Sequence, residues 1–537
     1  MQTKNRYFDI HPPVFWPSVI LIVSFIAVTL MVGEPMAVVF EELKGYVTAN
    51  AGWVFIIAVN AFIVFCFYLG FSKYGKVRLG GKDAEPEFST GSWFAMLFSA
   101  GMGIGLLFWG VAEPVNHYAS PPYGEPFTVA SAERAMNLTF LHWGFHAWAI
   151  YAVVALSLAF FAYNRKLPLT IRSVFQPLLG ERTNGWMGDV IDVLAVLATL
   201  FGLATSLGLG VKQVSGGLYY LFGLPNTVTV QVLLIAGITL IATISVVSGI
   251  DKGVKFLSEW NVRIAAILLV FVLIVGPSLF IFRSLVQNIG NYLDNILHVS
   301  SWTEAYRDNG WQGDWTVFYW AWWISWSPFV GMFIARVSKG RTIREFIFGV
   351  LLVPTALTFL WLTALGGSAI FLDMQESASQ VTPEHELALR IKADESTALF
   401  VFFENFPLST LGSVIGILLV TSFFVTSSDS GSLVIDSITA GGKLDSPVSQ
   451  RVFWATAEGG VAAVLLIGGG LTALQTAAIT TGLPFLFVLV VMCYSLFRGL
   501  QKEYARLRQF DEDVDRKSYE KRLSEVILKK LEQKKKP

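Results

Sequence analysis

The sequence predicts an all-α integral membrane protein with 12 transmembrane helices. Of its 537 residues, 54% are hydrophobic and 15% are charged, whereas soluble domains carry about 25% charged residues. The apolar residues form continuous runs of about 20, which is the length that a helix needs to cross a bilayer. A barrel would show alternation over about ten residues instead. The net charge is zero, so the composition gives no electrostatic basis for nucleic-acid binding.

Twelve apolar stretches are long enough to span a membrane. Only Lys4 and Arg6 are basic before the first one, and no small-residue cleavage site follows it. We therefore expect a retained helix and not a signal peptide. Cys66 and Cys493 both lie inside such stretches, which indicates inert core thiols. The predicted spans cover residues 14–32, 52–71, 92–111, 139–163, 189–210, 226–248, 261–282, 315–335, 346–370, 409–428, 454–474 and 477–497.

Basic residues predict the orientation of these spans. The loops after spans 2, 4 and 8 each hold four lysine or arginine residues, whereas the loops after spans 1 and 3 hold only Lys44 and Arg134. Because basic loops stay in the cytoplasm, the even-numbered spans are predicted to end inside. Both termini are then cytoplasmic, and we expect a multi-pass protein of the plasma (inner) membrane.

The predicted organisation is built on two repeats. A cytoplasmic N-terminus (1–13) precedes two extra helices and a basic loop (14–91). Spans 3–7 form a first five-helix repeat (92–283), and spans 8–12 form a second one (315–497). Because each repeat has an odd number of helices, the two are inverted in the membrane. An outer amphipathic helix and loop (284–314) connect them.

The charged tail differs from the rest of the chain. Residues 498–537 carry 13 basic and 8 acidic residues, a net charge of +5. Apolar residues at helical spacing predict a cytoplasmic helix. The tail is either a solvated stop-transfer segment or a surface that meets anionic lipid.

Two spans contain residues that interrupt helices. Span 3 carries Gly101, Gly103 and Gly105, each of which costs about 1 kcal/mol relative to alanine in a helix. The glycines either allow close helix packing or mark an unwound segment whose backbone binds a ligand. Span 8 carries Ser-Trp-Ser-Pro at 325–328, where the proline removes a backbone hydrogen bond. Interruptions at matching places of inverted repeats indicate a transporter site.

An aromatic stripe is the sharpest pattern in the sequence. One face of span 8 is aromatic over three turns, and span 4 adds three rings within about 140° of arc. Interface belts or packing against lipid are the alternatives, although a belt does not run for three turns. Such ring faces suit a quaternary ammonium ion, which has no N–H to donate. The rings are Trp315, Phe318, Tyr319, Trp322, Trp323 and Trp326 in span 8, and Trp143, Trp148 and Tyr151 in span 4.

Other polar groups inside the spans give weaker signals. The hydroxyls at 421–430, near the end of span 10, are oxygen ligands of the kind that sodium takes, or they bond back to their own helix. His142 and His146 are either core histidines or a metal site or proton relay. Arg263 either reaches the interface or stands near an ion site. We find no nucleophile–base pair, phosphate loop or metal motif, so no enzyme activity is predicted.

Two stretches resemble the betaine–choline–carnitine transporter family. They are GMGIGLLFWGVAEP at 101–114 and WTVFYWAWWISWSPFVGMFIARVSKGRTIREF at 315–346, and the resemblance covers roughly residues 10–500. It implies alternating access, a homotrimer, and uptake of trimethylammonium compounds, many of them osmoprotectants. It also implies a substrate box, a permeation path and a segment that faces the substrate carboxylate. The substrate box would be Trp143, Trp148, Tyr151 and Trp323, and the permeation path would include Trp322 and Trp326. The segment that faces the carboxylate would be Gly101, Gly103 and Gly105. An acid in place of Gly105 would suit choline better.

The resemblance further implies sodium as the coupling ion, with no other cofactor. Leu203 stands where a second sodium site would need threonine, which puts that site in doubt. Sodium-independent exchangers of the family replace ion sites with fixed side chains, and Arg263 lies near such a position. The first site would use Ser99, Met102, Phe423, Thr426 and Ser427, and the second would use Ala100, Thr199 and Phe329.

These observations predict a secondary transporter that imports glycine betaine by sodium symport. A choline or carnitine carrier with proton coupling or substrate exchange is the alternative, and an osmosensing channel is a remote one. The expected partners are a small quaternary ammonium substrate and the lipid bilayer, with no nucleic acid.

Overall fold

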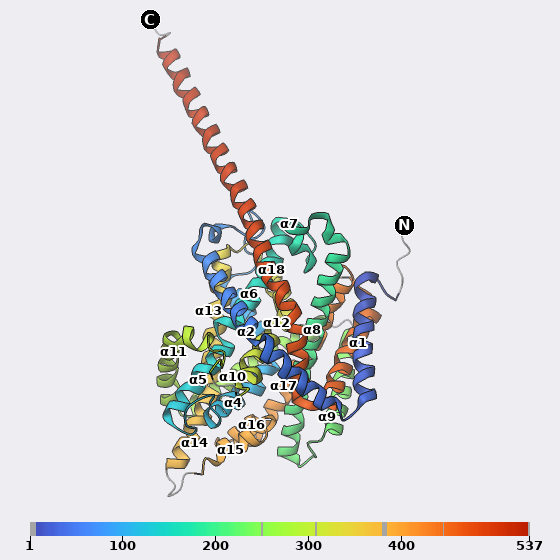
Figure 1. Ribbon diagram of the computed structural model, residues 1–537. Coiled ribbons are helices and arrows are strands. Elements are labelled where there is room, and N and C mark those ends of the chain that lie inside the picture. The colour runs from blue at the N-terminus through green and yellow to red at the C-terminus, as the bar shows by residue number, and fades with distance from the viewer. Residues whose placement is uncertain are drawn as a thin grey trace.

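The protein is a bundle of helices (Figure 1). The computed structural model describes residues 7–101, 103–248, 251–306, 309–378, 384–443 and 445–534. Within these residues β-type pairing is limited to one isolated bridge, between Arg78 and Thr342. The all-α prediction is therefore confirmed.

The described residues of the first half of the chain form eleven α-helices, several of them short. Its helices are α1 (Pro12–Val32), α2 (Met36–Phe71), α3 (Thr90–Gly101), α4 (Ile104–Ala119), α5 (Val129–Trp143), α6 (Phe145–Ala159), α7 (Gln176–Leu179), α8 (Trp186–Phe222), α9 (Val228–Ser248), α10 (Asp251–Val275) and α11 (Ser278–Ser300).

The second half begins with the π-helical turn η5 (Gly313–Val317), which leads directly into α12. Its helices are α12 (Phe318–Val337), α13 (Ile343–Leu362), α14 (Ser368–Ala378), α15 (Glu386–Ala393), α16 (Ala398–Phe403), α17 (Ser409–Thr439) and α18 (Val448–Lys534). A further π-helical turn, η6 (Thr363–Gly367), joins α13 to α14.

Local sequence signals set several helix ends. Prolines occupy the first turn of α1, where their missing N–H groups cost nothing. The chain leaves α1 through Gly33, whose φ of 68° favours glycine. Thr342 and Glu345 form a capping box at the start of α13.

Each of the twelve predicted spans falls mainly or entirely on helix. Among the described residues, nine helical segments are long and apolar enough to cross a membrane. Two predicted spans are not among these nine segments: span 8 on α12 and span 3 on the pair α3–α4. In addition, α18 is counted once although it carries both span 11 and span 12. The multi-pass membrane class is confirmed, while the count of 12 and the inverted repeats remain predictions.

The predicted interruption of span 8 is wrong. The helix α12 runs through Pro328 without a break. Proline cannot donate to the carbonyl of Ile324, but the Ser327 hydroxyl donates to that oxygen at 2.7 Å. The carbonyl that proline would orphan therefore keeps a partner, and the helix continues.

The second helix of each predicted repeat is irregular as well. In the first repeat, Gly144 separates α5 from α6 with φ −94° and ψ −143°. In the second repeat, η6 separates α13 from α14. A Cβ at position 144 would lie 2.4 Å from the carbonyl oxygen of Phe140, so a larger residue does not fit this bend.

The helix α12 lies in the middle of the bundle. It packs against α6, α8 and α18, and Trp320 and Trp322 are among its fully buried side chains. Large apolar side chains are exposed on α1, α2, α9 and α10, for example Ile57 and Ile267. An apolar outer surface of this kind matches a bilayer environment.

The last helix continues far beyond the bundle. Helical geometry in α18 is lost at Gly469 and Gly470 and then resumes through the predicted tail to Lys534. The tail is therefore helical, as predicted, and it projects away from the bundle (Figure 1). The start of α1 lies at the same end of the bundle, as an even number of crossings requires.

Candidate functional site

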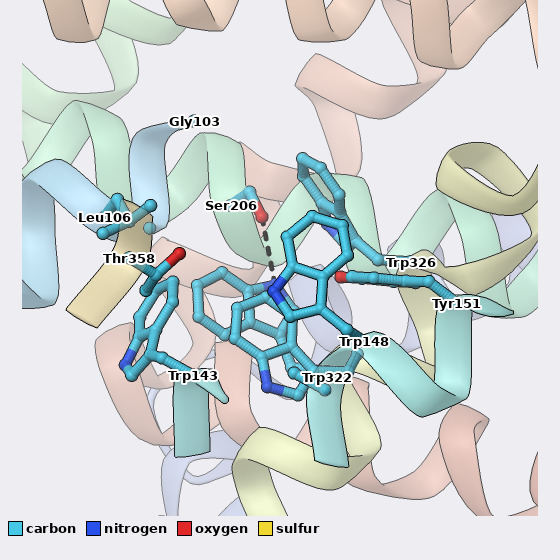
Figure 2. A pocket seen from close by; sticks show the side chains of 12 residues that line it. Gly103, Leu106, Trp143, Trp148, Tyr151, Ser206, Trp322, Trp326 and Thr358 are labelled. Carbon is cyan, nitrogen blue, oxygen red and sulfur yellow. Dashed lines mark hydrogen bonds between the residues drawn. The ribbon is translucent and has the colours of Figure 1, made fainter. Parts of the chain in front are cut away.

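An aromatic cavity lies at the centre of the bundle (Figure 2). Its cavity volume is about 40 Å³. All six aromatic residues that the sequence predicted for the site line this one cavity, although they come from two different parts of the chain. The lining residues are Gly103, Gly105, Leu106, Trp143, Ala147, Trp148, Tyr151, Ser206, Trp322, Trp323, Trp326 and Thr358.

The rings pack closely on one another around this space. Trp322 and Trp323 stack with centroids 4.8 Å apart and planes 13° from parallel. Trp143 meets Trp323 edge-on at 4.9 Å, and Trp148 meets Tyr151 edge-on at 5.5 Å. Such contacts fix the rings, so the box is preorganised for a ligand.

Four indole N–H groups of the box, those of Trp143, Trp322, Trp323 and Trp326, are satisfied by the protein. Trp323 donates to the carbonyl oxygen of His142 at 2.9 Å, and Trp326 donates to that of Gly202 at 2.9 Å. Trp322 donates to the Ser206 hydroxyl at 3.0 Å, which is the dashed line in Figure 2. Since these donors are already paired, the tryptophans offer π faces and C–H edges to a ligand. That surface suits a cation without N–H groups.

A broken helix opens onto the same cavity. The helix α3 ends at Gly101, and α4 starts at Ile104 after Gly103, whose backbone is extended. No side chain caps α4, so the amides of its first turn lack a capping partner and carry the positive end of the helix dipole. Gly103, Gly105 and Leu106 all line the cavity. The predicted break of the helix in span 3 is therefore confirmed. Met102 lies outside the residues that the structure describes.

Gly105 is required by the close approach of two rings. A Cβ at this position would lie 2.6 Å from Cη2 of Trp322 and 3.2 Å from Cη2 of Trp143. At Gly103 a Cβ would meet nothing within 4 Å. Gly103 thus lies at the break in the helix, whereas Gly105 allows close packing of two rings. Each of the two interpretations of the span 3 glycines, an unwound segment and close packing, therefore applies to one of them.

A second cavity adjoins the first at Trp326, which lines both. Its cavity volume is about 170 Å³, and its lining includes four of the five residues predicted for the first sodium site, all except Met102. Phe329, predicted for the second site, lines it as well, whereas Thr199 does not. The lining residues are Ser99, Ser258, Asn261, Trp326, Phe329, Val330, Phe333, Phe423, Thr426, Ser427 and Ser430.

The threonine hydroxyls at the predicted ion sites bond back to their own helices. Thr426 donates to the carbonyl oxygens of Ser422 and Phe423 at 3.1 and 3.2 Å, and Thr199 on α8 donates to that of Ala195 at 2.7 Å. This bonding uses the hydrogen and leaves oxygen lone pairs for a cation. The two interpretations of these hydroxyls are therefore compatible.

Asn261 is a polar residue of this cavity that the sequence analysis missed. It is 2% exposed. Its amide nitrogen donates to the Thr426 hydroxyl at 3.4 Å, and its amide oxygen accepts from the Ser422 hydroxyl. Arg263, two residues later on α10, has a side chain that is 59% exposed and contacts Glu259. Arg263 therefore does not replace an ion at this cavity, and the interfacial interpretation of it fits.

Glu113 is the second residue that the sequence analysis missed. It is fully buried on α4, three turns from the break. His142 binds one of its carboxylate oxygens at 2.7 Å, and Trp143 donates to the other at 2.6 Å. His142 and His146 do not act together, since the second ring bonds to Asn60 at 3.2 Å.

The fold and the cavity define a class: multi-pass membrane proteins that bind a small ligand beside a discontinuous helix, as secondary transporters do. The model of the betaine/carnitine/choline family of transporters matches residues 13–505, and the chain belongs to this family. It is a transporter and not an enzyme.

Characterised relatives cover most of the chain. A glycine betaine transporter of Acinetobacter baylyi is 45% identical over 95% of this chain and 76% of its own length. Glycine betaine transporter 1 of Vibrio parahaemolyticus is 50% identical over 92% of this chain and 95% of its own. A glycine betaine/proline/choline transporter of the same organism is 49% identical over 92% and 91%.

Proposed function

We propose that the protein imports glycine betaine, with the trimethylammonium group in the aromatic cavity and the carboxylate at the start of α4. The observation that supports this proposal is that one cavity combines two surfaces, each of which matches one charged group of the substrate. One surface consists of tryptophan ring faces, and the other is the uncapped N-terminus of α4. Ring quadrupoles attract a cation that cannot hydrogen bond, and a helix N-terminus attracts an anion. Accumulation of this solute would serve osmoprotection.

Sodium is the coupling ion in this proposal. Ser99, Phe423, Thr426 and Ser427 line the cavity that adjoins the substrate site, and hydroxyl and carbonyl oxygens are the donors that a hard cation takes. Met102 would belong to the same site. A second sodium at Ala100, Thr199 and Phe329 is less favoured, since Thr199 does not line the cavity that holds Phe329 and Leu203 stands where a threonine ligand is expected.

A choline or carnitine carrier is the alternative, with proton coupling or substrate exchange. One specific observation favours choline: a relative of nearly half identity is named a glycine betaine/proline/choline transporter. An osmosensing channel is less favoured, because the rings and the break enclose a site and not an open path.

The test is uptake of radiolabelled glycine betaine into proteoliposomes with and without an inward sodium gradient. Sodium-driven accumulation supports the symport proposal, and competition by unlabelled choline and carnitine ranks the substrates. Accumulation without sodium would refute symport, and absence of uptake would refute glycine betaine.

Matched variants locate the ion site. Thr426→Ala with Ser427→Ala should raise the sodium concentration for half-maximal uptake severalfold, because two oxygen donors are lost. Thr421→Ala is the control: its hydroxyl also bonds back to α17, at 2.8 Å from the Ile417 oxygen, but it does not line the cavity. An unchanged sodium curve in the double variant would exclude this site.

The setting of the transporter is part of the proposal. We expect a homotrimer in the plasma (inner) membrane with both termini in the cytoplasm. Cross-linking of the intact protein in membranes, and labelling of cysteines placed in either terminus from each side, would test these points.

A further inference from the structure

A buried carboxylate lies directly behind the aromatic cavity. Glu113 is 0% exposed, and it does not line the cavity itself. Its oxygens are reached from three elements: α4 through His117, α5 through His142 and Trp143, and α12 through Tyr319. A charge placed here is shielded from water by the rings of the box.

The hydrogen-bond donors around Glu113 match an ionised carboxylate. The indole of Trp143 can only donate, and the Tyr319 hydroxyl donates to the same oxygen. The other oxygen faces Nδ1 of His142, whose Nε2 lies 2.9 Å from the Thr316 hydroxyl. If Thr316 donates to Nε2, the ring carries its proton on Nδ1 and donates to Glu113. Three donors on one carboxyl group favour the anion.

Histidines are the nearest basic groups to this carboxylate. His117 Nε2 lies 3.4 Å from it without forming a hydrogen bond, and His142 lies at 2.7 Å. Among the described residues, no lysine or arginine forms an ion pair with Glu113, and His146 on α6 bonds to Asn60 instead. With neutral imidazoles, the cluster keeps a net negative charge.

The carboxylate contacts the box through its walls. Trp143, which donates to it, meets Trp323 edge-on at 4.9 Å. Tyr319, which also donates to it, packs against Trp322 and Trp323 with ring centroids at 6.0 and 5.8 Å. A hydrogen bond from an indole N–H to an anion raises the electron density of the ring, and this strengthens its attraction for a cation.

We infer that Glu113 is the counter-charge of the bound ammonium group and acts through Trp143 and Tyr319. This inference rests on the proposed function. The cavity wall is built of neutral rings, while the negative charge that a quaternary ammonium needs stands one layer behind them. Placed there, the carboxylate attracts the cation through a medium of low dielectric constant without offering a polar contact that water could occupy.

The position of Glu113 also separates substrate classes. It lies ten residues along α4 from Gly103, which is about 15 Å at 1.5 Å per residue. The carboxylate of a zwitterion at the start of α4 is therefore repelled less than its ammonium is attracted. A ligand with the same head group and no carboxylate depends on Glu113 more strongly, because nothing offsets the attraction.

The experiment compares Glu113→Gln with the wild type in detergent, using equilibrium binding of radiolabelled choline and radiolabelled glycine betaine. We expect choline affinity to fall at least tenfold and glycine betaine affinity to fall by a clearly smaller factor. Glu113→Asp, which keeps the charge, should restore most of the choline affinity. Thr139→Val, which removes a buried hydroxyl that bonds only to the Ala135 carbonyl oxygen of its own helix, should change both affinities less than twofold.

Equal losses for the two ligands in Glu113→Gln, or no loss at all, would overturn the inference and leave a packing role. If this variant does not fold, His117→Lys replaces it, since an ammonium 3 to 4 Å from the intact carboxylate neutralises the cluster and should give the same selective loss. Failure of the wild type to bind glycine betaine would refute the proposed function instead, so the two failures are distinguishable.

Discussion

Replacing Gly105 with alanine tests whether the two rings above it must stay where they are. The new Cβ would lie 2.6 Å from Cη2 of Trp322 and 3.2 Å from Cη2 of Trp143. Neither ring is free to turn away. Trp322 is bonded to Ser206 and stacked on Trp323, and Trp143 is bonded to Glu113.

The free-energy cost of placing a methyl group at position 105 follows from these distances. The end of the Trp322 ring must move by roughly 1 Å before its contact with the methyl group becomes favourable. Overpacking of this size costs about 1–3 kcal/mol. Because Trp322 lines the substrate cavity, we expect the loss to fall on the ligand-competent arrangement. Glycine betaine affinity should then decrease by roughly five- to hundredfold.

The assay is equilibrium binding of radiolabelled glycine betaine to purified protein, with a double-mutant cycle. Trp322→Phe removes Cη2 and so removes the clash. The double variant Gly105→Ala with Trp322→Phe should bind no worse than Trp322→Phe alone, which gives a coupling energy of about 1 kcal/mol or more. Wild-type affinity in Gly105→Ala, or a loss that Trp322→Phe does not reduce, would refute the steric argument.

Three further outcomes are expected. Trp323→Leu should raise the KM for uptake about tenfold or more, since a desolvated cation–π contact is worth about 2 kcal/mol; unchanged uptake would count against the box. Asn261→Ala should raise the sodium concentration for half-maximal uptake, because Asn261 bonds to a hydroxyl of the ion cavity, whereas Arg263→Ala, whose side chain is exposed, should leave it within twofold. Between α14 and α17, Arg390 bonds to both oxygens of Glu404 at 2.6 and 2.7 Å, and these bonds hold the pKa of that carboxyl below its usual 4.5. Because this pKa is lower in the folded state, the ionised carboxylate stabilises the segment above pH 4.5, and this stabilisation is lost as the pH falls below that value. Hydrogen-exchange protection of residues 386–406, corrected for intrinsic rates, should therefore drop between pH 5 and 3 in the wild type. The drop should be smaller in Arg390→Ala.

The aromatic site was predictable because its signal is periodic. Rings at helical spacing on α12 must share a face, and a face that is aromatic for three turns has few structural uses. The structure confirms that Trp322, Trp323 and Trp326 meet Trp143 and Tyr151 in one cavity. Here residue type and spacing together carried enough information.

The parts that were not predictable depend on single local events. Pro328 does not break α12 because the preceding serine bonds the orphaned carbonyl, and a sequence pattern cannot show whether a hydroxyl will do so. Glu113 lies two residues past the predicted end of span 3, so it was taken as a loop residue. The break at Gly103 extends α4 to Ala119 and buries that carboxylate.

Asn261 and Arg263 differ in their positions around the axis of α10, and this difference decides which of them reaches the cavity. Asn261 and Arg263 are two residues apart on α10, which is about 200° around the axis at 100° per residue. One therefore faces the cavity and the other faces outward. The sequence analysis placed both residues at the start of predicted span 7 (261–282) and assigned neither to a face of the helix.

The shared wall at Trp326 has a thermodynamic consequence. This indole borders both cavities, is hydrogen bonded to the backbone of α8, and contacts Phe329 at 5.4 Å. If an occupant of one cavity changes the preferred position of this ring, it changes the affinity of the other cavity by some factor. Linkage then requires the second occupant to change the affinity of the first by the same factor. A substitution at Trp326 that removes this coupling should therefore remove it in both directions, so that neither occupant changes the affinity for the other.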